Sequence, residues 1–297
     1  MDFPCLEKKV GIMKNSTHAL QVHLLSRFQL WRDGELILSD TWHAEKSKSI
    51  LKLFLSERGR VYAHEEFITH LFPDLDPDKA ALNLRVRICG LRRILEPNLE
   101  RREHSQFILT THGGYYFNPD AHCWIDLEEF AEHCKKALEL ERHGRWTHAI
   151  RNYETADQLY QGDFLAEDRY EEWTIAPRER WRETYLIALS HLADCYAHLG
   201  HYEMAIGCCR KSLCTAPDRE DCYRQLMLYH YLEGNQAEAL KIFEQCSEHL
   251  QQSLAQEPSD ITQNFYEQIL HRRVFHRGNE VLTLPQTQFA DYPAPRF

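Results

Sequence analysis

Four arginines and an asparagine lie close together in one segment of the chain. They are Asn83, Arg85, Arg87, Arg92 and Arg93. An arginine side chain can bind guanine at two points, and an asparagine can bind adenine in the same way. Further arginines can bind phosphate and set the register without reading bases. These residue types therefore indicate recognition of a nucleic acid.

The spacing of apolar residues predicts that this segment is a helix over residues 78–95, which ends before Pro97. The apolar residues recur at steps of four, three and four, at Leu84, Ile88, Leu91 and Leu95. We expect this stripe to be core and Arg93 to lie on the far side, with Arg85 and Arg87 flanking it and Arg92 nearer the core edge. An ordinary solvated helix face is the alternative for these arginines.

The segments around this helix predict a winged helix, in which the second helix of a pair enters the major groove. Strand-forming residues come first, an Asp-Gly turn at 33–34 follows, and a Gly-Gly turn at 113–114 closes a later hairpin. The predicted strands are 22–31, 36–38, 107–111 and 115–117, and the predicted helices before 78–95 are 46–57 and 63–72.

The tip of the hairpin is the predicted wing. It carries Thr111 and His112, whose hydroxyl and imidazole can hydrogen-bond a phosphate, although a plain structural turn is the alternative. Lys46 and Lys48, at the start of the first predicted helix, complete the predicted DNA-binding set.

Charge is segregated along the chain, which has a net charge of −10. Residues 121–270 hold 14 basic and 27 acidic residues, whereas residues 79–102 hold seven basic and two acidic ones. The local field of a surface decides what it attracts, so the net charge does not exclude a nucleic acid partner.

The second half of the chain is predicted to be all helical from Asp126, with an internal repeat. A glycine, a residue two positions on and an alanine five positions on recur at Gly144/Trp146/Ala149, Gly200/Tyr202/Ala205 and Gly234/Gln236/Ala239. The last two copies are 34 residues apart, which is the tetratricopeptide period. Residues 161–177 read as an insertion between repeats.

Several function classes find no support in the sequence. It has no phosphate loop, no nucleophile elbow and no zinc-protease motif, so we expect no enzyme and no cofactor. The ten cysteines have no zinc-knuckle spacing, so we expect no metal. No signal peptide and no apolar run of membrane-spanning length are present, which predicts a cytoplasmic protein that does not bind membranes.

Motifs along about residues 24–270 resemble SARP-type regulators, which join an OmpR/PhoB-like winged helix to a bacterial transcriptional activation domain. The motifs are Trp31-Arg32-Asp33-Gly34, Leu71-Phe72-Pro73-Asp74, Ala81-Leu82-Asn83-Leu84-Arg85-Val86, Leu91-Arg92-Arg93-Ile94-Leu95, Gly113-Gly114-Tyr115, Tyr160-Gln161-Gly162-Asp163-Phe164-Leu165 and Glu257-Pro258-Ser259. The resemblance implies sequence-specific binding to double-stranded DNA, usually at direct repeats, and activation through RNA polymerase.

We therefore expect a mostly α protein with small β elements: a winged helix-turn-helix domain followed by an all-α tetratricopeptide-like repeat domain. The predicted parts are a leader (1–20), the DNA-binding domain (21–120), the helical domain (121–272) and a loose tail (273–297). The predicted function is a transcriptional activator, with a homodimer on DNA as one arrangement. The alternatives are a protein scaffold whose winged helix no longer binds DNA, and a repressor with the same DNA contacts.

Overall fold

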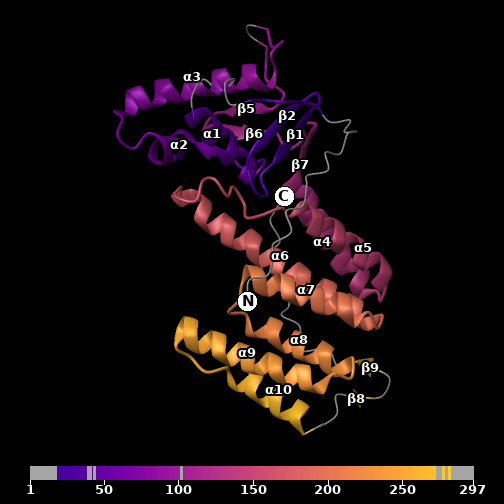
Figure 1. Cartoon of the computed structure of the whole chain (residues 1–297). Helices are drawn as coiled ribbons and strands as arrows, with labels where there is room; N and C mark the ends of the chain where they lie inside the picture. Colours follow the sequence, from indigo (N-terminus) through magenta and orange to yellow (C-terminus); the bar gives the residue numbers. More distant parts are fainter. Residues whose placement is uncertain are drawn as a thin grey trace. The chain divides into compact units, whose positions relative to one another are not determined.

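The computed structural model describes residues 19–38, 42, 45–100, 103–271, 276–277 and 280–281. This part of the chain divides into two compact units, and the division falls between Ile125 and Asp126 (Figure 1). Most of the predicted leader, and the predicted tail apart from two short strands, lie outside the described residues.

The first unit begins with a four-stranded sheet in the order β3-β2-β1-β7. Its strands are β1 (Leu20–His23), β2 (Gln29–Arg32), β3 (Glu35–Leu36) and β7 (Cys123–Ile125). The prediction of one strand over 22–31 is wrong, because the chain reverses near Ser26, which has a φ of 112°. The reversal pairs Val22 with Leu30 and buries both side chains. The predicted Asp-Gly turn is confirmed between β2 and β3.

Three helices follow, and each agrees with its predicted bounds to within one residue at either end. They are α1 (Glu45–Ser56), α2 (His64–Leu71) and α3 (Pro77–Leu95). The α3 helix begins with a proline after Asp76, whose carboxylate accepts a hydrogen bond from the amide of Asp78 at 3.2 Å. Proline suits the first helical position because its missing N–H would have no partner there.

The wing belongs to a three-stranded sheet in the order β4-β6-β5. The strands are β4 (Tyr62–Ala63), β5 (Ile108–Thr111) and β6 (Gly114–Phe117). A Cβ atom at Gly114 would lie 1.9 Å from the carbonyl oxygen of Tyr62, so only glycine allows β4 and β6 to approach this closely. With α2 and α3 packed together, this unit has the predicted winged-helix fold.

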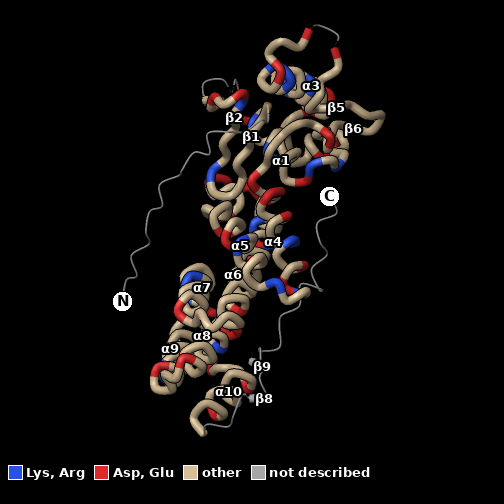
Figure 2. Tube along the Cα trace, turned by 90° about the vertical axis from the view of Figure 1, so that its right-hand side faces the viewer, with Lys and Arg blue, Asp and Glu red and all other residues tan. Residues whose placement is uncertain are grey.

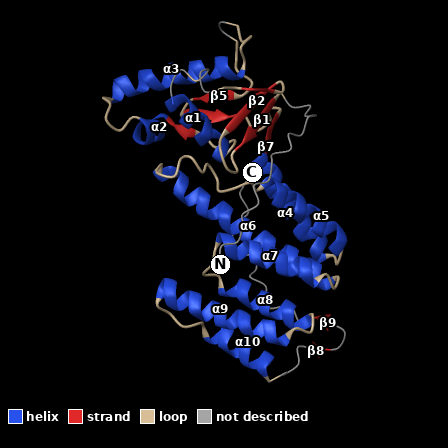
Figure 3. Ribbon diagram, viewed as in Figure 1, coloured by secondary structure: helices blue, strands red, loops and turns tan. Residues whose placement is uncertain are grey.

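The described residues of the second unit form a series of seven helices, and each of them packs against the next (Figure 3). They are α4 (Asp126–Arg142), α5 (Trp146–Leu159), α6 (Glu172–His198), α7 (Tyr202–Thr215), α8 (Glu220–Leu232), α9 (Gln236–Leu254) and α10 (Asp260–Leu270). A two-stranded element, β8 (His276–Arg277) with β9 (Glu280–Val281), lies beyond α10 in the sequence.

The predicted repeat is confirmed by the turns between paired helices. Gly144, Gly200 and Gly234 have φ values of 66°, 76° and 92°, a conformation that glycine adopts without strain. The alanine five residues after each glycine is fully buried, which lets neighbouring helices come close. The second unit is therefore an all-α, tetratricopeptide-like repeat domain.

Candidate nucleic-acid interface

The α3 helix has one buried face and one exposed face, as its periodicity predicts. The buried residues are Ala80, Leu84, Ile88, Leu91, Ile94 and Leu95. Arg85 and Arg93 are exposed, and the basic positions of α3 are blue in Figure 2. Arg87 is half-buried, and its Nε atom is buried without a hydrogen-bond partner among the described residues.

Two other arginines attach α3 to its neighbours. Arg92 donates from Nε and Nη2 to the carbonyl oxygen of Ile108, at 3.0 and 2.9 Å, and from Nη2 to the hydroxyl of Thr110 at 2.8 Å. Arg32 donates from Nη1 to the carbonyl oxygen of Ile94 at 2.5 Å. Because Ile108 and Thr110 belong to β5, Arg92 sets the position of the wing relative to the helix.

The remaining predicted basic residues make local contacts. Lys46 donates to the carbonyl oxygen of Leu71 at 2.5 Å, and its ammonium lies 4.6 Å from the ring centroid of Phe72. Lys48 forms an ion pair with Glu45 at 3.2 Å. Lys46 thus joins α1 to the end of α2. An exposed ion pair such as that between Lys48 and Glu45 contributes little to the stability of the fold.

Asn83 and the wing tip complete the predicted set. The Asn83 amide donates to the carbonyl oxygen of Lys79 at 3.0 Å, one turn earlier in α3. Thr111 and His112 are both exposed, and Thr111 pairs with Gly114 across the hairpin. The predicted set therefore separates into exposed side chains on α3 and at the wing tip, and side chains that hold the fold.

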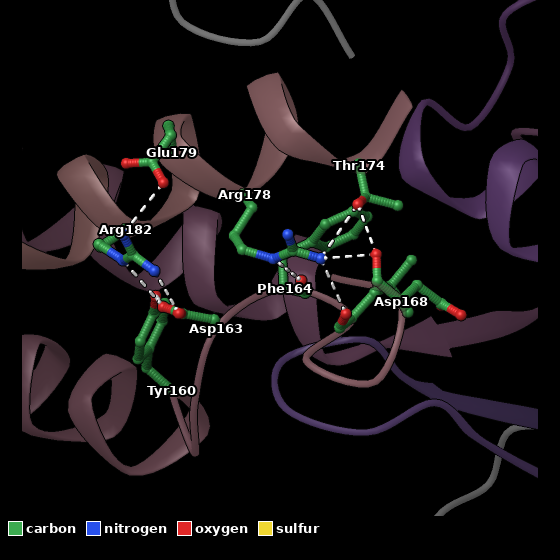
Figure 4. Close-up of polar contacts among 9 residues, drawn as sticks. Tyr160, Asp163, Phe164, Asp168, Thr174, Arg178, Glu179 and Arg182 are labelled. Atoms are coloured by element: carbon green, nitrogen blue, oxygen red, sulfur yellow. Dashed lines mark hydrogen bonds and ion pairs between the residues drawn. The ribbon is translucent and has the colours of Figure 1, made fainter. Parts of the chain in front are cut away.

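A second cluster of polar contacts lies in the helical unit, where it holds the loop before α6 (Figure 4). The buried Arg178 donates from Nε to the carbonyl oxygen of Phe164 at 3.0 Å. Its Nη2 donates to the carbonyl oxygens of Leu165 and Asp168 at 3.0 and 3.1 Å. The hydroxyl of Thr174 accepts a further hydrogen bond from Nη2 at 3.0 Å.

The same loop is held at its beginning by Asp163 and Arg182. Arg182 donates from Nε to the Asp163 carboxylate at 3.1 Å, and the Tyr160 hydroxyl donates to it at 3.2 Å. Burial alone would raise the pKa of Asp163, but the hydrogen bond and the charge of Arg182 outweigh burial and lower the pKa. The motif at residues 160–165 is thus explained by the arginines of α6 that bind it.

Sequence reasoning missed Arg178, although a signal for it exists. Thr174, Arg178, Trp181 and Tyr185 are buried on α6 at steps of four, three and four. An arginine in such a stripe requires oxygen partners inside the protein, because a buried guanidinium without partners is costly. This pattern separates a structural arginine from an exposed one.

No group of three or more metal-ligating side chains suited to an ion occurs among the described residues. The imidazole of His198 instead stacks on Trp146, with ring centroids 4.1 Å apart. None of the helices in the described ranges combines the length and apolar character needed to span a bilayer.

Comparison with known proteins confirms the resemblance to SARP-type regulators. Residues 125–270 match the family model of the bacterial transcriptional activator domain. The chain is 23% identical to the transcriptional regulatory protein MoaR1 of Mycobacterium tuberculosis, over 88% of this chain and 83% of MoaR1. It is 25% identical to the regulatory protein AfsR of Streptomyces coelicolor, over 90% of this chain but 25% of AfsR.

A solved structure shares the fold of both units. It is EmbR of Mycobacterium tuberculosis in complex with a low-affinity phosphopeptide, with a TM-score of 0.75 and 22% sequence identity. The match covers 86% of this chain and 66% of the EmbR chain. A winged helix followed by tetratricopeptide-like helices is therefore an architecture that this chain shares with a protein named as a transcriptional regulator.

Proposed function

We propose that this chain regulates transcription by binding double-stranded DNA at specific sequences, and that it activates genes through contact with RNA polymerase. The observation that carries the proposal is the exposed face of α3. Arg85 and Arg93 project from a helix whose opposite face is buried in a winged helix. The names of MoaR1, AfsR and EmbR support a regulatory role. On this proposal the chain acts by binding rather than by catalysis.

The α3 helix would enter the major groove, which is wide enough to admit a helix. Arg85 and Arg93 would contact guanine or phosphate, and Arg87 would contact phosphate with the part of its guanidinium that reaches solvent. Thr111 and His112 would hydrogen-bond a phosphate of the DNA beside the wing. Asn83 and Lys48 would reach DNA only by leaving their present partners.

Arg92 and Lys46 would act mainly as positioning residues. Their donors are directed at the carbonyl oxygens of Ile108 and Leu71, which belong to the wing and to α2. Because both residues hold elements next to α3, their loss would weaken DNA binding through the geometry of the domain.

The helical unit would bind the protein partner. Residues 121–270 carry 27 acidic and 14 basic residues, which suits a basic partner surface and repels DNA. We assign DNA binding to residues 21–120 and partner binding to residues 121–272. Two copies on adjacent direct repeats would bring two helical units to one promoter.

The test is selection of bound duplexes from a random pool with the full chain, followed by titrations at several salt concentrations. A reader of duplex DNA loses affinity steeply as salt rises, because bound phosphates release their counterions. We expect the Arg85→Ala/Arg93→Ala variant to lose specific binding and to reduce the slope of log K against log[salt] by about 2. Its circular dichroism spectrum should match that of the wild type, since both side chains are exposed.

The matched control is Arg142→Ala/Arg151→Ala, which removes two exposed arginines from the helical unit. This variant should bind DNA like the wild type. If the α3 variant kept full affinity and the full salt slope, DNA binding through α3 would be refuted. If the wild type selected no duplex, a protein-binding winged helix would be the better reading.

A further inference from the structure

Two aliphatic side chains stand exposed on the same face of α3. Leu82 and Val86 are 63% and 59% exposed, and they lie one helical turn apart. The core stripe of α3 runs through Leu84, Ile88 and Leu91 instead. Packing inside the winged helix therefore does not explain why this face is apolar.

The apolar pair continues into the arginine-bearing face of the helix. Positions 82, 86, 89 and 93 follow one another at steps of four, three and four. Cys89 is exposed between Val86 and Arg93, and the exposed Arg85 lies between the two aliphatic residues in sequence. The face thus combines a small apolar strip with positive charges beside it.

Positive charge beside an apolar strip suits duplex DNA that contains thymine. The C5 methyl group of thymine is the apolar feature of the major groove, and the phosphates on either side are negative. We propose that Leu82 and Val86 are specificity-determining residues that contact thymine methyl groups. This inference rests on the proposed DNA binding through α3.

The hydrogen bonds of the neighbouring side chains support this reading. The Asn83 amide donates to Lys79 within the helix, and the Arg92 guanidinium donates to β5. The middle of the α3 face therefore offers methyl groups, while Arg85 beside the strip and Arg93 at its end supply the hydrogen bonds. We therefore expect the duplexes that the chain selects to carry thymine at the base pairs that Leu82 and Val86 contact.

The geometry of a helix also predicts the spacing of the thymines. Four residues of an α-helix rise about 6 Å, and successive base pairs in a duplex are about 3.4 Å apart. Leu82 and Val86 would therefore contact methyl groups separated by about two base-pair steps.

The experiment replaces single thymines with deoxyuridine in a duplex selected by the full chain. Deoxyuridine keeps the hydrogen-bonding groups of thymine and lacks only the methyl group. At each contacted position we expect the Kd of the wild type to rise about fourfold, from the burial of one methyl group. The Val86→Ala and Leu82→Ala variants should each become insensitive to deoxyuridine at one of the two positions.

The control is Val61→Ala, which shortens another exposed aliphatic side chain of the winged helix. It should keep the full sensitivity to deoxyuridine. If the wild type bound with a steep salt dependence but tolerated deoxyuridine everywhere, the methyl contact would be overturned and DNA binding would stand. The same holds if both α3 variants kept the wild-type sensitivity. A wild type that selects no duplex would overturn both proposals and favour a protein partner for this face.

Discussion

Replacement of Arg178 by methionine should destabilise the helical unit strongly. Methionine has a similar apolar stem but no donors, so the change removes the hydrogen bonds to the carbonyl oxygens of Phe164, Leu165 and Asp168 and to the Thr174 hydroxyl. Phe164 and Leu165 are fully buried, so water cannot easily replace the lost donors. Arg178→Met therefore leaves the carbonyl oxygen of Phe164 without a donor among the described residues and removes one of the donors to each of the other acceptors.

The magnitude follows from those acceptors. A buried polar group left without a partner costs about 1–3 kcal/mol. The Phe164 carbonyl is left without a donor in the described part of the chain, whereas that of Leu165 keeps the amide of Asp168 at 2.9 Å. Together with the lost donations to Leu165, Asp168 and Thr174, this gives a loss of about 3–4 kcal/mol in the free energy of unfolding. In a domain of this size that loss lowers the unfolding midpoint by about 6–16 °C.

The assay is thermal unfolding of the full chain, followed by circular dichroism at a helical wavelength. Arg178→Lys should fall between the wild type and Arg178→Met, because an ammonium retains some donors but lacks the planar fork. The control, Arg169→Met, removes an exposed arginine from the same loop and should change stability by less than about 0.5 kcal/mol. A folded Arg178→Met protein within about 1 kcal/mol of the wild type would refute the reasoning.

Three further predictions concern single positions. Gly114→Ala should cost about 1–3 kcal/mol, because its Cβ would lie 1.9 Å from the Tyr62 carbonyl oxygen; faster hydrogen exchange in β4 and β6 would report it. Ala239→Leu should cost a similar amount, about 1–3 kcal/mol, since Ala239 is fully buried between helices; denaturant titration measures this. Burial lowers the pKa of His230, so the folded state binds its proton less readily than the unfolded state does. The chain should therefore lose stability as the pH falls below the ordinary histidine pKa, and His230→Phe should lessen that loss.

Each of these predictions has a matched control. Gly113→Ala places a Cβ with no atom within 4 Å and should be tolerated. Ala237→Leu changes an exposed residue of α9, and His201→Phe changes an exposed histidine. Equal effects in a test variant and its control would contradict the corresponding prediction.

Local patterns predicted the helices and the repeat well. The bounds of α1, α2 and α3 and the start of α4 follow from apolar periodicity, proline positions and glycine stops, which act over a few residues. The turn glycines and buried alanines of the second unit follow for the same reason. The apolar stripe of α3 likewise indicated which face of that helix is buried.

The sequence did not predict the pairing of strands that are distant along the chain. The strands β4 and β7 are two and three residues long, too short to show a period, and β7 pairs in parallel with β1 from far along the chain. Residues 22–31 are rich in strand-forming types, so the sequence predicted one strand where the chain reverses direction. The reason is that β propensity does not show where a strand folds back.

The candidate site also has features that the local sequence predicted and features that only the folded structure decided. Residue types alone indicated a basic helix that could meet DNA, because guanidinium chemistry and helical spacing are properties of the local sequence. Only the tertiary structure decided that Arg92 and Arg178 donate to carbonyl oxygens of the protein itself, whereas Arg85 and Arg93 are exposed. The physical reason is that a buried carbonyl without a partner must recruit a donor, and which donor lies within reach depends on segments brought together by folding.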